Sequence, residues 1–219
     1  MNRILSTVSV FLLSGLFCFS AKADNSGSDQ VTCDYQVGEF TSFEVNVPAD
    51  IVYESGRPFL SIAGQEKALS YIEVKSENGQ LVVKSKKKFK NFRKLSIIAS
   101  SDCLEHIRLN GAAEFECERG FDTESLTVQL NGACELDLDN ISADKMDFTL
   151  NGAGEIDLEH LNCLERINVV VNGAGSAKLS GTAGSADLKI NGAGSVDAKE
   201  LNCKNVSSSV NGVGSIKTR

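Results

Sequence analysis

The sequence predicts an all-β protein whose larger part is a short parallel β-helix, a solenoid with coils of about 20 residues, with an N-terminal β cap. The dipeptide Asn-Gly occurs six times in the second half, at Asn110, Asn131, Asn151, Asn172, Asn191 and Asn211. These positions are 21, 20, 21, 19 and 20 residues apart, and a fixed period of this length is typical of stacked coils. Between them apolar and polar residues alternate, which indicates strands with one buried face.

Residues 1–23 are expected to be a secretory signal peptide. A basic start, an apolar run over residues 4–19 and the small residues of Ala21-Lys22-Ala23 match such a peptide. The run is too short and too often broken by serine to predict a membrane span. Cys18 would suggest a lipoprotein, but the bulky Phe17 before it fits a lipid-attachment signal poorly. The chain is therefore expected to be exported, to the periplasm or the cell surface of a Gram-negative bacterium.

The exported part, residues 24–219, is strongly acidic and long enough for one continuous domain. Removal of Arg3 and Lys22 with the signal leaves 20 basic and 29 acidic side chains, a net charge of −9. An acidic exported protein is a poor candidate for binding nucleic acid. One segment reverses the charge, because residues 84–94 carry seven basic side chains and no acidic one.

Six cysteines remain in the exported part, and an even number in an exported protein raises the question of disulfides. They are Cys33, Cys103, Cys117, Cys134, Cys163 and Cys203. Coils stack ~4.8 Å apart, so only matching positions in adjacent coils meet disulfide geometry, and no two repeat cysteines do. We expect most of them to be buried small apolar groups, while a bridge from Cys33 to one of them stays open.

Residues 101–219 predict six coils, each with two short strands and two corners. In the second coil, residues 126–130 alternate before the Asn131-Gly132 corner, and a second alternation follows over residues 135–138. Asn and Gly suit a corner because both tolerate a positive φ, and stacked asparagine side chains can hydrogen-bond along a column. Asn-Gly also favours two-residue hairpins, but a meander would not repeat the same residue types at one regular interval.

Residues 24–100 predict an N-terminal β cap or irregular first coils. Residues 43–47 alternate between apolar and polar, and Asn78-Gly79 between two strand-like runs indicates a true hairpin. Solenoid ends expose unpaired strand edges and need protection. At the other end, Lys217 and Arg219 fit as edge charges against further stacking, or the bare last coil is the contact of a homo-oligomer.

The corners and the strands after them resemble the autotransporter adhesin head GIN domain family of exported bacterial proteins. The resemblance covers roughly residues 37–217, through the Asn-Gly-Ala-Gly corners followed by Glu/Ser-x-Asp/Lys. Phe43-Glu44-Val45 and residues 78–83 also resemble the opening strands of that family. The resemblance implies a right-handed β-helix, an exported location and an adhesin role, and it brings no catalytic residues.

Two outward columns of carboxylates along the predicted coils are the first candidate site. One column holds Glu114, Glu135 and Glu155, and the other holds Glu116, Asp137 and Asp157. Carboxylates ~4.8 Å apart repel unless a cation or solvent screens them, and oxygen ligands at that spacing suit calcium. The Gly-Gly-x-Gly-x-Asp nonapeptide of dedicated calcium solenoids is absent. A solvated acidic face is therefore the preferred interpretation and a calcium ladder the alternative, and no cofactor is predicted.

The basic segment is the second candidate site, with Lys86, Lys87, Lys88, Phe89, Lys90, Phe92 and Arg93. Its cations suit anionic lipid headgroups, lipopolysaccharide or acidic glycans, and the two aromatic rings could anchor such a ligand. The preferred interpretation is a solvated loop or edge strand whose lysines prevent edge pairing, and the anionic ligand is the alternative. Attraction to the acidic coils of the same chain is a third possibility.

No catalytic residue is predicted. The only histidines, His106 and His160, fall in different columns, and neither lies in a recognisable nucleophile or zinc motif. The short corners also leave no long loops for the cleft of a polysaccharide-active β-helix. The sequence favours a non-enzymatic binding or adhesion module that presents flat faces to a glycan, an envelope component or a protein. A periplasmic structural protein is the alternative, followed by a carbohydrate-active enzyme.

Overall fold

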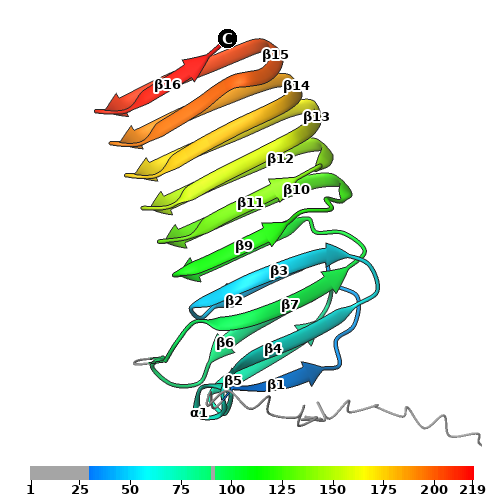
Figure 1. The fold of residues 1–219 in the computed structure, drawn as a ribbon. Coiled ribbons are helices and arrows are strands. Elements are labelled where there is room, and N and C mark those ends of the chain that lie inside the picture. Colours follow the sequence, from blue (N-terminus) through cyan, green and yellow to red (C-terminus); the bar gives the residue numbers. More distant parts are fainter. Residues whose placement is uncertain (1–29, 90–91) are drawn as a thin grey trace, which may run out of the picture.

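The computed structural model describes residues 30–89 and 92–219 and confirms a β-solenoid of about six turns with a β cap at its N-terminal end (Figure 1). All sixteen described strands belong to one sheet. The predicted signal peptide, Cys18 and Lys90 lie outside the described residues.

The elements follow one another with short connections. The strands are β1 (Gln30–Tyr35), β2 (Ser42–Asn46), β3 (Ala49–Ser55), β4 (Phe59–Gln65), β5 (Ile72–Glu77), β6 (Gln80–Ser85), β7 (Leu95–Ser101), β8 (His106–Gly111), β9 (Ala113–Cys117), β10 (Asp122–Gly132), β11 (Glu135–Asp139), β12 (Ser142–Gly152), β13 (Glu155–Gly173), β14 (Ser176–Gly192), β15 (Ser195–Gly212) and β16 (Ser215–Thr218). The one helix of the described residues is α1 (Glu66–Leu69).

From β8 to β16 each coil pairs in parallel with the coils above and below it, in the register that the repeat predicts. Asn131, for example, pairs with Asn110 in the coil below and with Asn151 in the coil above. Figure 1 shows these coils stacked from β9 to β16, with the C-terminus at the end of the stack. Identical positions therefore form columns along the solenoid.

Each complete coil has three strand segments, one more than the sequence analysis assigned. In the pairing of β13 with β14 the register shifts after Leu158 and again after Cys163. The short segment Leu161–Cys163 between these shifts pairs with Gly181–Ala183 and forms a third side. The corner before it takes a positive φ at Asn140 (58°) and His160 (51°) in successive coils.

At the Asn-Gly corners only the glycine has a positive φ, although both residue types tolerate one. The φ values run from 110° at Gly111 to 142° at Gly192, whereas no asparagine of these corners has a positive φ. Each corner glycine above Gly111 also lies directly against the coil below: a Cβ on Gly152 would stand 2.1 Å from the carbonyl oxygen of Gly132. The corner therefore requires glycine for both conformation and space.

The corner asparagines form a hydrogen-bonded ladder, in which each Nδ2 donates to the Oδ1 of the asparagine one coil below. From the top, the six distances are 3.0 Å (Asn211 to Asn191), 2.7 Å, 2.8 Å, 2.9 Å, 2.8 Å and 2.5 Å (Asn110 to Asn46). The seventh member, Asn46, donates to Glu44 at 2.7 Å and was not predicted. The side-chain amide, which forms this ladder, is thus the physical reason for asparagine at the corner, as in cross-β stacks.

The first three coils do not follow the order of the chain. Strand β2 lies between β8 and β6, and β3 lies between β9 and β7, all in parallel. Residues 42–55 are therefore a coil inserted between residues 80–101 and residues 106–117. Its corner, Asn46-Val47-Pro48, has no Asn-Gly pair, which is why the repeat pattern did not reveal it.

The N-terminal cap consists of antiparallel strands laid on the lowest coil. Strand β5 pairs with β6, β4 pairs with β7, and β1 pairs with β4, while α1 packs against β4 and β1. The hairpin predicted at Asn78-Gly79 is confirmed, with φ values of 52° and 73° at these two residues. The antiparallel strands end the parallel stack with a different pairing geometry, which protects that end.

The core is aromatic near the cap and aliphatic above it. Phe40, Phe43, Phe115, Tyr53 and Phe121 form a chain of ring contacts with centroid distances of 5.6–6.4 Å. The buried Tyr53 hydroxyl donates to the carbonyl oxygen of Ser101 at 3.0 Å, and burial raises the pKa of this phenol. Above Phe121 the buried side chains are mainly aliphatic, with the ring of Phe148 as an exception.

The repeat cysteines are free thiols, and Cys117, Cys134 and Cys163 are buried. Burial raises the pKa of these three thiols, so they act as small apolar groups. The bridge from Cys33 that the sequence left open is not formed to any of them.

Gly152→Ala is expected to lower the free energy of unfolding by about 2–4 kcal/mol, because the new Cβ meets the Gly132 carbonyl in a positive-φ position. Gly38→Ala is the matched control, since nothing lies within 4 Å of a Cβ there. Urea denaturation of both variants measures the difference. Equal stability of the two would contradict the close approach of the coils.

Candidate functional site

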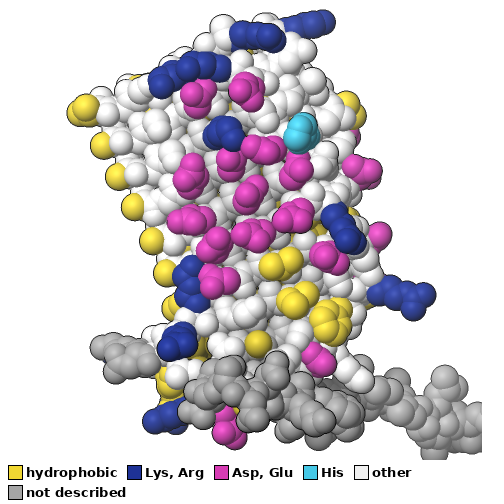
Figure 2. Space-filling model, in the orientation of Figure 1, with side chains coloured by type: hydrophobic (Ala, Val, Ile, Leu, Met, Phe, Trp, Pro, Cys, Tyr) yellow, Lys and Arg dark blue, Asp and Glu magenta, His cyan; other side chains and the backbone are white. Residues whose placement is uncertain are grey.

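The predicted carboxylate columns lie on the outer surface of the second side of the coils, across β9, β11 and the start of β13. Register pairs Glu135 with Glu114 and Glu155, and Asp137 with Glu116 and Asp157. A third pair, Asp139 with Glu159, extends the surface. Figure 2 shows these acidic side chains gathered over the middle coils, where they line a depression of about 240 Å³.

A lysine bonds to the carboxylates at each end of this acidic surface. At the lower end Lys94 Nζ lies 2.6 Å from Asp50 and 3.5 Å from Glu114. At the upper end Lys178 Nζ lies 3.1 Å from Asp157 and 2.8 Å from Glu159, and these bonds raise the pKa of Lys178. The sequence placed Lys178 in its column, but the role of Lys94 depends on pairing that local patterns do not show.

Between the two lysines the carboxylates have no directly bonded cation within the described residues. Glu116, Glu135, Asp137 and Glu155 form no ion pair there. Desolvation, followed by the charges of Asp157, Glu159 and Asp139, raises the pKa of Asp137. One oxygen of Asp157, Oδ1, is buried without a hydrogen-bond partner. The middle of the surface is thus a field of uncompensated negative charge.

The calcium ladder stays an untested alternative. Across residues 30–89 and 92–219, no group of three or more His, Cys, Asp or Glu side chains is arranged to hold a metal ion. At the edge of this surface, His160 Nδ1 lies 2.7 Å from Asp139 Oδ1. This contact raises the pKa of the imidazole.

Directly below the acidic surface lies an exposed apolar patch that the sequence analysis did not identify. Val52, Ile98 and Phe59 are 43%, 49% and 41% exposed. Val52 pairs with Ile98 on one side and with Glu116 on the other, so patch and carboxylates are continuous (Figure 2). Their outward positions follow strand alternation, but the pairing that brings them together depends on the inserted coil.

The basic segment is the enlarged corner of the lowest coil. Asn46 pairs with Lys84 and Ala49 with Leu95, so the connection from Lys84 to Leu95 is longer in sequence than the equivalent corner Val47-Pro48. Lys86, Lys87 and Lys88 are exposed.

The two rings of the basic segment contact the protein itself. The ring centroid of Phe92 lies 5.7 Å from that of Tyr71 and 5.1 Å from that of Phe89. Both phenylalanines pack against the core. The ammonium of Lys87 lies 4.8 Å from the centre of the Tyr71 ring. The aromatic side chains therefore hold the segment in place and direct its lysines outward.

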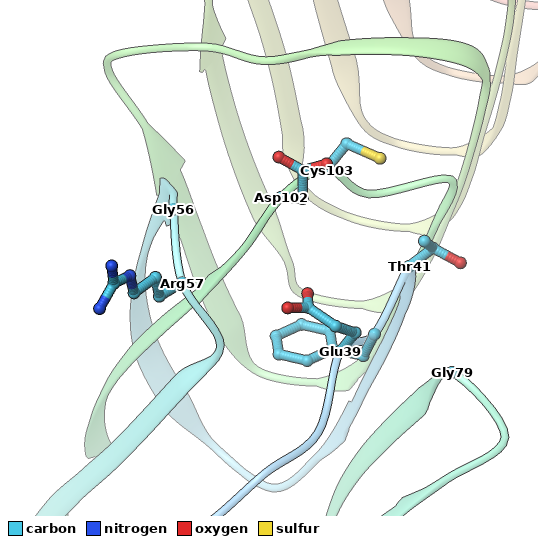
Figure 3. Close-up of a pocket in the computed structure, with 8 residues that line it drawn as sticks. Glu39, Thr41, Gly56, Arg57, Gly79, Asp102 and Cys103 are labelled. Carbon is cyan, nitrogen blue, oxygen red and sulfur yellow. The ribbon is translucent and has the colours of Figure 1, made fainter.

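A cavity of about 660 Å³ opens near the cap, where the lowest coils lack a regular third side. Four separate segments line it: residues 39–41, the Gly56-Arg57 turn, Gly79 and the Asp102-Cys103 connection. Figure 3 shows Arg57 directed away from the other lining side chains. Phe40, which is 2% exposed, contributes almost no surface to a ligand.

The two histidines lie apart in the part of the chain that the structure describes. His106 begins β8 on the first side of its coil, whereas His160 lies at a corner of β13. The partner of His160 is Asp139, and no serine or cysteine joins this pair.

Asp137→Asn is expected to raise the free energy of unfolding near neutral pH by about 0.5 kcal/mol, because stacked like charges destabilise a sheet. The pKa of Asp137 is raised in the folded state. The ionised carboxylate therefore lowers the free energy of unfolding above this pKa, and it has no such effect below the pKa of the unfolded chain, where the carboxyl is protonated in both states. The gain should therefore vanish in acid. Denaturation at both pH values tests this, with the exposed Glu124→Gln as control; an equal gain at both pH values would refute the charge argument.

Among the described residues, no helix is long and apolar enough to cross a membrane. No curated protein matches the chain significantly.

The solved structures that share the fold include the following three. A "putative adhesin" of Bacteroides fragilis is 22% identical, with a TM-score of 0.69 over 89% of this chain and 98% of that one. A "putative lipid binding protein" of Parabacteroides distasonis is 17% identical, with a TM-score of 0.73 over 88% and 98%. A "putative adhesin" of Parabacteroides merdae is 21% identical, with a TM-score of 0.57 over 88% and 97%.

The description of the family model that matches this chain, together with the adhesin names of two of these structures, points to a non-enzymatic protein with a binding role, exported or on a cell surface. The family model described as "Putative auto-transporter adhesin, head GIN domain" matches residues 39–219, which is most of the chain. Together with the solenoid of Asn-Gly corners, this match places the protein in the head GIN domain family.

Proposed function

We propose that this protein is a non-enzymatic adhesion module that binds a glycan through the outer surface of its second side. We call this surface the contact face and define it by Val52, Phe59, Ile98, Glu116 and Asp137. The observation that carries the proposal is the continuity of an exposed apolar patch with carboxylates that have no counter-charge. Both features cost solubility or stability in the free protein, and a ligand that covers them removes that cost.

A neutral or amino sugar fits this surface better than an acidic one. Carboxylate oxygens accept hydrogen bonds from sugar hydroxyls, and the 41% exposed ring of Phe59 offers a flat apolar surface for sugar C–H groups. Acidic glycans would meet the uncompensated charges of Glu116 and Asp137. The contact face is open, and its depression of about 240 Å³ is small for an enclosed ligand, so the face suits one side of a polymer better than an enclosed small molecule.

The basic segment supports a second candidate, an anionic envelope component such as a lipid headgroup. Lys86, Lys87 and Lys88 project from a corner held in place by the packing of Phe92 on Tyr71. A preorganised cluster of cations loses little conformational entropy when it binds an anion. The structural neighbour from Parabacteroides distasonis described as a lipid-binding protein fits this candidate.

A periplasmic structural role is the remaining candidate. Val206 and Val210 of the last coil are 42% and 40% exposed, because no further coil covers them among the described residues. Copies that stack through this coil would bury both side chains. In that case the protein would be an oligomer in the periplasm and not an adhesin on the surface of a Gram-negative cell.

Phe59→Ala and Ile98→Ser are expected to weaken binding to arrayed neutral glycans by about ten-fold or more, because each removes a central apolar contact. Leu164→Ser is the matched control, since Leu164 is 63% exposed and outside the contact face. Loss of binding to acidic glycans or anionic vesicles only in the combined Lys86→Gln, Lys87→Gln, Lys88→Gln variant would favour the basic segment. No binding on either surface would refute both candidates.

Protease treatment of intact cells carrying a tagged copy is expected to remove the tag without lysis, because an adhesin must be reachable from outside. A tagged periplasmic protein serves as the control for intact outer membranes. Protection of the tag until the outer membrane is opened would exclude the adhesion role and leave the structural one.

A further inference from the structure

Seven Asn-Gly dipeptides occur in the described residues, and this dipeptide is chemically labile in water. The glycine nitrogen attacks Cγ of the asparagine, so that an N–Cγ bond forms, the Cγ–Nδ2 bond breaks and ammonia leaves with the amide proton. Water then opens the resulting succinimide at either carbonyl to give aspartate or isoaspartate. Glycine favours the attack because no side chain shields its nitrogen. The fold decides which of the seven can react.

Six of the seven asparagines are held by the ladder. Asn131, for example, donates from Nδ2 to Asn110 at 2.8 Å and accepts at Oδ1 from Asn151 at 2.9 Å. The same residue and Gly132 pair in parallel with the coils on both sides. To turn its Cγ towards the glycine nitrogen, an internal asparagine must break two hydrogen bonds and disturb the sheet. Asn211 has only the bond to Asn191, since no described residue donates to it.

Asn78 has none of these restraints. It lies exposed in the two-residue turn between β5 and β6, with φ of 52°, outside the strand pairing. Within the described residues its side-chain amide makes no hydrogen bond, and the Gly79 N–H donates none to the backbone. Both reacting groups are therefore open to water and free to approach each other.

We propose that Asn78 is a site of spontaneous deamidation in the folded protein, and that the asparagine ladder protects the six repeat asparagines from the same reaction. Asn211, with half of the ladder bonds, is second in reactivity. The protein thus carries one chemically unstable Asn-Gly turn outside the protected asparagine column. This inference does not depend on the proposed ligand.

The product alters the region around the cap cavity. The Gly79 carbonyl accepts hydrogen bonds from the N–H groups of Thr41 and Ser42 at 3.0 and 3.1 Å, and Gly79 lines the cavity. Deamidation adds a negative charge next to Glu77, and isoaspartate also lengthens the backbone of the turn by one carbon. Ageing therefore changes the charge and the geometry of this cavity rim.

Incubation of the folded protein in mildly alkaline buffer, followed by peptide mapping with mass spectrometry, measures each site. We expect deamidation at Asn78 to be about ten-fold or more faster than at Asn131, Asn151 or Asn172, since the latter must break two hydrogen bonds. The same chain in denaturant is the control, because identical dipeptides should then react at similar rates. Equal rates at Asn78 and the internal sites of the folded protein would overturn the proposal.

Asn131→Ser tests the ladder itself, because it removes the acceptor of Asn151 and leaves the backbone pairing in place. We expect faster deamidation at Asn151 in this variant and an unchanged rate at Asn191, two coils further along the ladder. Thermal denaturation verifies that the variant is folded at the incubation temperature. An unchanged rate at Asn151 in the folded variant would overturn the protective role of the ladder.

Discussion

The close approach of successive coils at the Asn-Gly corner is the constraint on which the rest of the structure depends. A Cβ on any of the five upper corner glycines would stand 2.1–2.2 Å from the carbonyl oxygen of the glycine below. This contact holds the coils at one strand spacing and in one register. Every other position must then stack on its equivalent, so each column is favourable or unfavourable according to its residue type. Asparagines gain a ladder, apolar residues gain a core, and carboxylates repel.

The acidic surface is the costly result of this geometry. A solenoid cannot separate Glu135 from Glu114 and Glu155 once their coils are in register. The structure limits the cost with Lys94 at one end and Lys178 at the other, and leaves the middle carboxylates to solvent. An ordinary solvated face consists of polar side chains. This surface differs, because exposed Val52 and Ile98 lie beside its carboxylates.

Features that repeat along the chain could be predicted from the sequence, and features that depend on long-range pairing could not. The period, the columns and the Asn78-Gly79 hairpin follow from local patterns. The inserted coil was missed because Asn46 is followed by Val47-Pro48 and because strand order is not encoded locally. The apolar patch of Val52 and Ile98 was missed for the same reason. The packing of the rings of the basic segment on the protein itself could not be predicted either, because the sequence does not show that Tyr71 lies beside Phe92.

The order of the coils has a consequence for how the chain folds. The coil of residues 42–55 has paired strands on its upper side only when β8 and β9 lie on top of it. The second of these strands ends at Cys117. The lower part is thus a nucleus of high contact order, which must bring together distant segments before any of them is stable. Each coil above β9 then contacts mainly the one before it and adds with little further loop-closure cost. During synthesis the upper coils would grow one by one on a base that assembles all at once.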